Sequence, residues 1–275
     1  MRSVLSLIFL LVVSACGTTY VLPKADDGVT NQATAMFEEA RADTVRKLTS
    51  PSAASTRFQR VARRVAPVAA ALCSQELARE KPVDCNVALE VDSKLQDRNA
   101  YFTYKKAGNK LPVIRFSMPL LQDVKSDDEL AFILGHEYGH LIGQHIQKQQ
   151  QQQIAGALIL GAISAYTQAS AASYGGYYDS DAVSRDVELG AQIGGAAFSK
   201  TYELESDMLG TRIAHRAGYD PVEGAKFFAR KEAVKTKSGQ LSFWGTHPAD
   251  SERVAVVLAT MKQIEGKQAL SKKQN

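Results

Sequence analysis

The sequence predicts an α+β fold that is mainly helical, with one small antiparallel sheet beside a central helix. Three observations predict it. Apolar residues recur at alternating spacings of three and four from Phe58 to Leu72, which is typical of a core-facing helix. Short apolar runs with a different period lie between Pro82 and Phe116. A pattern that caps helices begins at Ser126.

The composition is that of a globular protein. The 275 residues are 45% hydrophobic and 23% charged, enough for one large domain or two small ones. The net charge of +4 comes from 33 basic and 29 acidic residues that are spread along the chain. This pattern lacks the basic cluster of a nucleic-acid-binding surface, so we expect no nucleic-acid partner.

The N-terminus is typical of an exported protein. Residues 1–15 join the basic Arg2 to an apolar run at 4–13 and then to small residues, as in a secretory signal too short to span a membrane. Cys16 follows as in a bacterial lipobox, so we expect a lipidated N-terminus that attaches the protein to a membrane. Because Gly17 is not Asp, the expected location is the periplasmic face of the outer membrane if the organism is Gram-negative. The alternative is an ordinary cleavage site with an incidental cysteine.

Export implies an oxidising compartment, which makes Cys73 and Cys85 candidates for a disulfide. Closing a loop of this size stabilises a fold by about 3 kcal/mol in the chain-entropy model. Two buried free thiols are the alternative, and the sequence does not decide between them.

The predicted domain organisation is simple. Residues 16–30 are expected to be the lipidated cysteine and a tether, 31–265 a single domain, and 266–275 a polar tail. In the first half of that domain the apolar stripe predicts a core helix rather than a cofactor site. Its members are Phe58, Val61, Val65, Val68 and Leu72.

The predicted sheet has three strands. Its apolar runs are 87–91, 101–104 and 113–116, with a turn at 107–110 between the last two. An exposed edge strand can align an extended peptide through main-chain hydrogen bonds, and a scaffold role is equally compatible with the sequence.

The central helix carries the motif H-E-x-x-H. Ser126 and Glu129 have the spacing of a capping box, and His136 then lies about two turns into the helix. His136 and His140, four residues apart, share one face and can bind one zinc ion, while Glu137 can act as a general base. The alternative is a surface helix with unrelated side chains.

Residues 149–178 contain no charged side chain. A glutamine run is followed by a short apolar stretch at 154–165, which cannot span a bilayer unaided. We expect a helix that leads into a mobile segment covering a cleft. Contact with a membrane surface or a partner is the alternative.

A later helix, expected from Ser199 to Gly218, offers a third metal ligand. Glu203 and Asp207 are four residues apart and share a face, so Asp207 could hydrogen-bond an imidazole when Glu203 binds the metal. A solvated acidic face is the alternative, and Glu205, about 200° from Glu203, fits such a face.

Together these motifs resemble the zinc metallopeptidases of the CAAX-protease and HtpX type. Members pair H-E-x-x-H with a downstream Glu-x-x-x-Asp, here Glu203 to Asp207 with Gly210 three residues on. The similarity covers about residues 55–265, and it is strongest to a lipoprotein branch. It implies a zincin-like domain with one Zn²⁺ per chain, held by His136, His140 and Glu203.

The resemblance also implies roles for two residues after the third ligand. Arg253 would position substrate or Asp207. His247, which precedes Pro248, could be a fourth ligand that keeps the site closed, or an oxyanion donor. A loop histidine near the surface is the third alternative. His145 and His215 have no ligand spacing and are interpreted as structural.

The function expected from these patterns is zinc-dependent peptide hydrolysis, with Glu137 and Asp207 as the catalytic carboxylates. Resemblance to the lipoprotein branch implies unfolded or misassembled envelope proteins as substrates. It also implies the outer-membrane assembly machinery as a partner. The alternative is a chaperone or assembly factor with little proteolytic activity.

Overall fold

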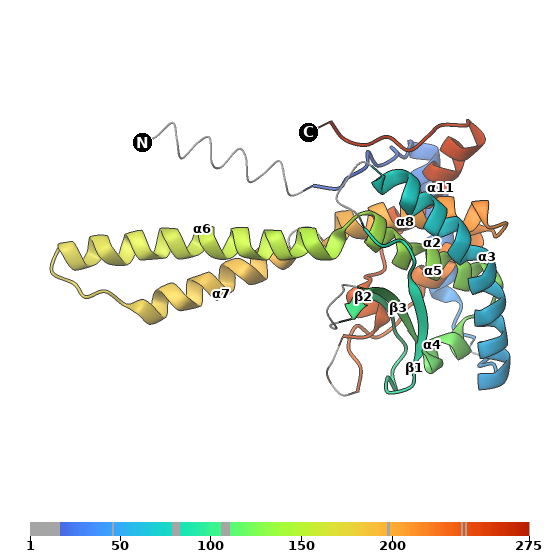
Figure 1. Cartoon of the computed structure of the whole chain (residues 1–275), viewed down its shortest axis with the longest axis horizontal. Helices are drawn as coiled ribbons and strands as arrows, with labels where there is room; N and C mark the ends of the chain where they lie inside the picture. The colour runs from blue at the N-terminus through green and yellow to red at the C-terminus, as the bar shows by residue number, and fades with distance from the viewer. Residues whose placement is uncertain are drawn as a thin grey trace. The chain divides into compact units, whose positions relative to one another are not determined.

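The structure is a computed structural model that describes most of the chain. The described residues are 17–45, 47–78, 83–105, 111–196, 199–237, 239 and 241–274. The predicted signal sequence, Cys16 and the turn at 107–110 lie outside them. The elements are drawn in Figure 1.

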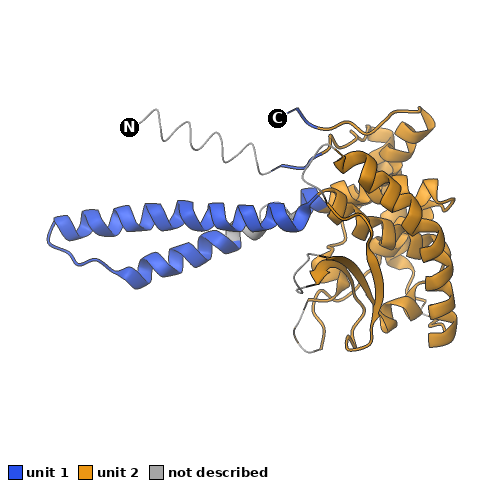
Figure 2. Cartoon of the chain, viewed as in Figure 1, with its two compact units in different colours: residues 1–19, 144–202, 273–275 blue, residues 20–143, 203–272 orange. Residues whose placement is uncertain are grey.

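The chain divides into two compact units, coloured separately in Figure 2. The first comprises residues 1–19, 144–202 and 273–275. The second comprises 20–143 and 203–272. The predicted domain 31–265 contains segments of both units.

Three helices of the second unit form a core of small apolar side chains. Helix α2 (Asp27–Ala42) packs against α9 (Pro221–Ala229) and α11 (Ser251–Glu265). Asp26 caps its N-terminus, because the Asp26 side chain accepts a hydrogen bond from Val29 N. The core residues are Val29, Ala33, Ala40, Ala229, Val254, Ala255, Leu258 and Ala259.

Helix α3 (Pro51–Leu77) follows the predicted apolar stripe. Ser50 caps it by accepting from Ala53 N. Of the five stripe residues, all but Val68 are fully buried, and the helix packs on α4 and α5. Near its end Cys73 forms a disulfide with Cys85, with the two Cα atoms 5.8 Å apart.

The sheet is mixed rather than antiparallel throughout. Its strands β1 (Ala88–Asp92), β2 (Ala100–Lys105) and β3 (Leu111–Ser117) lie in the order β1-β3-β2. Strand β2 pairs antiparallel with β3 as expected, but β1 pairs parallel with it. Strand β3 is the central strand, with β1 on one edge and β2 on the other. Its apolar residues Val113, Ile114 and Phe116 are all 0% exposed, as expected for a central strand.

Helix α5 (Asp127–Ile142) follows the short helix α4 (Met118–Asp123) and lies at the centre of the second unit. Ser126 caps it by accepting from Glu129 N at 3.1 Å. The reciprocal half of the capping box differs, because the Glu129 carboxylate accepts from Lys125 N. Helix α5 packs on α3, α9 and the sheet, so it is buried on every side rather than along one stripe.

The first unit contains a helical hairpin. Helices α6 (His145–Ser173) and α7 (Ser180–Ala196) pack along each other (Figure 1). Glycines permit the close approach, because a Cβ at Gly190 would collide with the backbone of Gly156. The expected mobile segment is wrong for residues 166–173, which continue α6; these residues are mainly alanine and serine, and alanine favours a helix.

The segment expected to be a free tether is anchored to the fold at Tyr20. Tyr20 is 0% exposed, its N–H donates to Glu205 Oε1 at 2.6 Å, and it forms a β-bridge with Lys272. Glu205 on α8 (Ser199–Arg216) is also 0% exposed, so the prediction of a solvated face there is wrong. The face is covered by the two ends of the chain, which helical spacing cannot reveal.

Candidate metal centre

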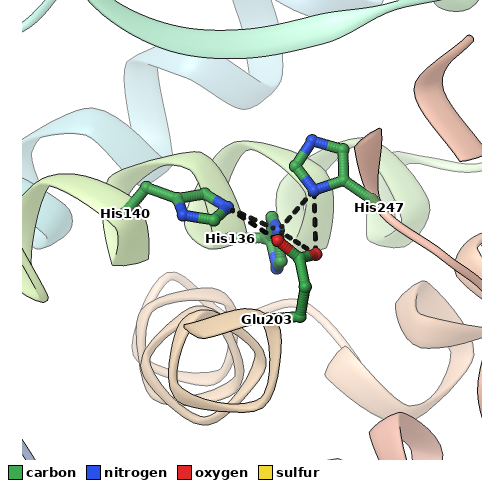
Figure 3. Close-up of side chains that lie close together, drawn as sticks. All are labelled: His136, His140, Glu203 and His247. Carbon is green, nitrogen blue, oxygen red and sulfur yellow. Dashed lines mark hydrogen bonds and ion pairs between the residues drawn. The ribbon is translucent and has the colours of Figure 1, made fainter. Parts of the chain in front are cut away.

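Three predicted ligands converge in the second unit. His136 Nε2 and His140 Nε2, both on α5, lie 3.1 Å apart. The carboxylate of Glu203 on α8 lies 3.4 Å from each, through Oε2 to His136 and Oε1 to His140 (Figure 3). The acidic pair on α8 therefore faces the motif on α5 and not solvent.

Glycines set the distance between the two helices. A Cβ at Gly139 would lie 2.7 Å from Ser206 Cα, and one at Gly135 would lie 2.9 Å from Gly210 O. The backbones of α5 and α8 thus touch where the ligands are carried. The sequence analysis did not use this signal, although Gly135 and Gly139, and Ser206 and Gly210, are small-residue pairs four apart on the two helices.

His247 completes the cluster. It follows α10 (Phe243–Thr246), and its Nδ1 lies 2.8 Å from Glu203 Oε2 and 3.2 Å from His136 Nε2. Its side chain is buried, at 6% exposure. The alternative of a loop histidine near the surface is therefore wrong.

Asp207 lies behind His136. Its Oδ1 is 2.8 Å from His136 Nδ1, and both residues are buried. An ionised carboxylate only accepts, so Nδ1–H of His136 donates to Asp207, and Nε2 is the atom that can bind a metal once it has lost its proton. This is the arrangement that the i,i+4 spacing predicts.

Arg253, in the first turn of α11, holds Asp207 with two hydrogen bonds. Its Nε donates to Oδ2 and its Nη2 to Oδ1, both at 2.7 Å. The guanidinium also lies 3.3 Å from Glu203 Oε2 and stacks over Phe228. Since Arg253 is only 3% exposed, the geometry favours positioning of Asp207 over contact with substrate.

The buried charged groups shift one another's pKa values. Burial lowers the pKa of His136, but the carboxylates of Glu203 and Asp207 outweigh it and raise that pKa to about 9. Burial raises the pKa of Glu203, but His247, Arg253 and His136 bring it well below its ordinary value. The Glu203 carboxylate is therefore ionised and available as a ligand at neutral pH.

Glu137 faces the same site. It is 1% exposed, and its Oε1 has no hydrogen-bond partner among the described residues, with His247 Nε2 3.4 Å away. The backbone of Phe102 in β2 hydrogen-bonds to its carboxylate. Burial raises the pKa of Glu137, which suits a group that accepts a proton near neutral pH.

The cluster fits a tetrahedral metal ion. The ligand atoms of His136, His140, Glu203 and His247 all lie within 4.8 Å of one another. Tetrahedral zinc with bonds of about 2.0–2.1 Å places neighbouring ligand atoms about 3.3 Å apart, close to the separations observed here. Three imidazoles and a carboxylate are also donors that zinc prefers.

Comparison with known proteins identifies the family. The model of peptidase family M48 matches residues 55–261, which include the whole cluster. The chain belongs to peptidase family M48. The M48 match begins in α3 and ends in α11, so the helices and sheet that carry the site all lie within it. This confirms the resemblance seen in the motifs and assigns a metallopeptidase domain to the chain.

Two relatives support the M48 assignment. Metalloprotease LoiP of Escherichia coli (strain K12) is 32% identical over 133 residues, covering 48% of this chain and 49% of LoiP. The beta-barrel assembly-enhancing protease of Yersinia pestis is 26% identical over 140 residues, covering 50% of this chain and 28% of its own length. The M48 chain thus spans about half of the first relative and less of the second.

Proposed function

We propose that this protein is a zinc-dependent endopeptidase that cleaves misfolded or misassembled envelope proteins. The observation that carries the proposal is Glu137 Oε1, which is buried and accepts no hydrogen bond from the described residues, beside a converging set of metal ligands. A buried carboxylate oxygen that accepts no hydrogen bond is costly, and a bound water would supply one.

In the proposed mechanism His136, His140 and Glu203 hold one zinc ion, and Asp207 fixes the tautomer of His136. Bound zinc would polarise the scissile carbonyl and acidify a water molecule. Glu137 takes a proton from the attacking water at Oε1 and passes it to the leaving amine. Arg253 keeps Asp207 ionised and oriented.

His247 has two candidate roles in this mechanism. Its Nδ1 lies among the ligands, so it can act as a fourth ligand that closes the site at rest. Its Nε2 lies near Glu137 Oε1, so it can also donate to an oxyanion after it moves. Higher peptidase activity of His247→Ala supports the closed resting state, and lower activity supports the donor. Unchanged activity contradicts both.

Strand β2 is a candidate for aligning the substrate. It is an edge strand of the sheet, whose order is β1-β3-β2, and the backbone of its Phe102 hydrogen-bonds to the Glu137 carboxylate. A peptide added along this edge would run beside the proposed general base. Proline substitution at Tyr104, which lies on the same side of β2 as Phe102, should raise KM if β2 binds the peptide.

The proposed location is the outer membrane, through lipidation at Cys16. The lipobox pattern and the name of the Yersinia pestis relative support this location and contact with outer-membrane assembly machinery. Growth with a fatty-acid analogue should label the wild-type chain and leave Cys16→Ser unlabelled. A soluble, unlabelled wild-type protein would contradict the proposal.

A chaperone or assembly factor with little proteolysis is the second candidate, favoured by the position of His247 in the cluster. One experiment separates the two. The chain from Gly17 onward is purified, its zinc content is measured, and cleavage of an unfolded protein is followed for wild type and Glu137→Gln. Cleavage by the wild type alone supports the peptidase. Equal rates for both proteins contradict the role of Glu137.

A further inference from the structure

The hairpin of α6 and α7 carries an unusual amount of exposed apolar surface. Nine of the sixteen exposed large apolar residues in the described part of the chain lie within residues 154–189. Five of them are aliphatic residues on the two helices, and four are tyrosines. They are Ile154, Leu158, Ile163, Tyr166, Tyr174, Tyr177, Tyr178, Val187 and Leu189.

Charge is distributed unequally between the two helices. Residues 149–178, which include most of α6, contain no charged side chain. Residues 179–196 contain four acidic side chains and one basic side chain, a net charge of −3. These are Asp179, Asp181, Asp186, Glu188 and Arg185.

The contacts of two glycines show which sides of α6 and α7 face each other and which sides point away. Gly161 on α6 faces Val187, and Gly190 on α7 faces the backbone of α6. Ile163 and Tyr166 are rotated about 200° and 140° from Gly161, which turns them away from α7. By the same measure Asp181, Arg185 and Glu188 on α7 point away from α6. The hairpin is therefore apolar on the α6 side, at Ile163 and Tyr166, and charged on the α7 side. An apolar side of this kind can be buried at the boundary between headgroups and acyl chains of a bilayer.

The start of the described chain is bound to the base of this hairpin. Lys148 Nζ, in the first turn of α6, donates to Thr19 Oγ1 at 2.6 Å. Thr19 is three residues after Cys16, a reach of about 11 Å at most. A lipid on Cys16 would thus hold the base of α6 near a bilayer.

We propose that the α6–α7 hairpin binds the surface of a lipid bilayer through the apolar face of α6, with its tyrosines in the headgroup layer. Helix α6 is long and apolar enough to cross a membrane, and only 11% of its most apolar window is buried. Crossing would, however, carry Arg185, Asp186 and Glu188 on the paired helix into hydrocarbon, which is unfavourable. The surface orientation keeps them in water. This inference does not depend on peptidase activity.

Vesicle flotation tests the proposal on the chain from Gly17 onward, which has no cysteine to acylate at position 16 and includes every described residue. Because the hairpin is acidic, we expect binding to neutral phosphatidylcholine vesicles that persists in 0.5 M salt, a concentration at which the Debye length is about 4 Å. Vesicles with added phosphatidylglycerol should bind no better. Ile163→Asp with Tyr166→Asp should lower the bound fraction at least tenfold.

Val45→Asp with Leu48→Asp is the control, because Val45 and Leu48 are apolar and 70% and 63% exposed but lie outside the hairpin. It should bind as the wild type does. A second readout does not depend on a disruptive change: Tyr166→Trp should be quenched by brominated lipids, and Val45→Trp should not. Failure of the wild type to float overturns the proposal, as does binding that requires anionic lipid and is lost in salt. The proposal is also overturned if the wild type binds no vesicles but self-associates, and if the double variant abolishes this self-association. That outcome would assign the apolar face to a second copy of the chain.

Discussion

Arg253 and Asp207 form a buried, two-point ion pair, with both N–O distances 2.7 Å and both side chains at most 4% exposed. The pair lies behind His136, whose Nδ1 is bonded to the same carboxylate. Three segments of the chain are thereby linked at one carboxylate. The contribution of the pair to the free energy of unfolding and its effect on zinc affinity can be measured separately.

Arg253→Met should destabilise the protein by about 3–5 kcal/mol, because it leaves the Asp207 carboxylate buried without its partner. The double variant Arg253→Met with Asp207→Leu should recover much of that loss, since neither charge remains. Its zinc affinity should still be about 10–100-fold weaker, because His136 has lost the group that orients it. Urea unfolding gives the first quantity and chelator competition the second. A double variant with native zinc affinity would contradict the role of Asp207.

Gly139→Ala should separate α5 from α8. Its new Cβ would lie 2.7 Å from Ser206 Cα, so the helices must shift, at a cost of about 1–3 kcal/mol. The shift also moves Glu203 away from His140, and zinc affinity should fall with stability. Gly28→Ala is the control, because its Cβ meets only the Asp26 side chain on an exposed helix. A variant at Gly139 that matches wild type in both measurements would exclude close packing as the cause of the site's geometry.

Stabilisation by zinc should increase with pH. In the metal-free protein the pKa of His136 is about 9, against an ordinary 6.5, so the proton on His136 stabilises the fold fully below about pH 6.5. That contribution is lost as pH rises toward 9. Zinc must displace this proton, and its affinity should rise by up to about tenfold per pH unit over the same range.

The measurement is the increase in unfolding temperature on adding zinc, taken at pH 6, 7.25 and 8.5. The increase should be smallest at pH 6. Asp207→Asn removes one carboxylate that raises the pKa of His136, so its zinc response should vary less with pH. A wild-type response that is the same at all three values would contradict the assignment of His136 as a ligand that must lose a proton.

Removing the Cys73–Cys85 bridge should destabilise the fold without changing the metal centre. The bridge closes a loop with a sequence separation of 12, for which the chain-entropy model gives about 3 kcal/mol. The double variant Cys73→Ser with Cys85→Ser should therefore have a lower urea midpoint than the wild type, and its zinc affinity in the folded state should be unchanged. Equal masses of the wild type alkylated with and without reductant would instead indicate free thiols.

Much of this site could be predicted because its parts are local. The spacing of His136 and His140, the cap at Ser126 and the shared face of Glu203 and Asp207 each follow from a few consecutive residues. Helical periodicity gives such relationships directly. The disulfide was an open alternative because thiol pairing depends on distance in space.

The remaining features depend on contacts between distant segments. The burial of Glu205 requires Tyr20, 185 positions away, and the parallel pairing of β1 requires β3 to lie between β1 and β2. His247 could be assigned a place beside the metal ligands only by family resemblance, since no local pattern connects it with His136. The glycines of α5 and α8 were a local signal, but their meaning depends on the two helices touching.

The time during synthesis at which the metal centre can assemble follows from these separations along the sequence. His247 lies 111 residues after His136, and Arg253 lies 117 after it. A chain that emerges N-terminus first contains the residues of its central helix well before the segment carrying His247 and Arg253 exists. A nascent chain shorter than 253 residues therefore lacks the guanidinium that compensates Asp207, and the complete centre can form only after residue 253 has been added.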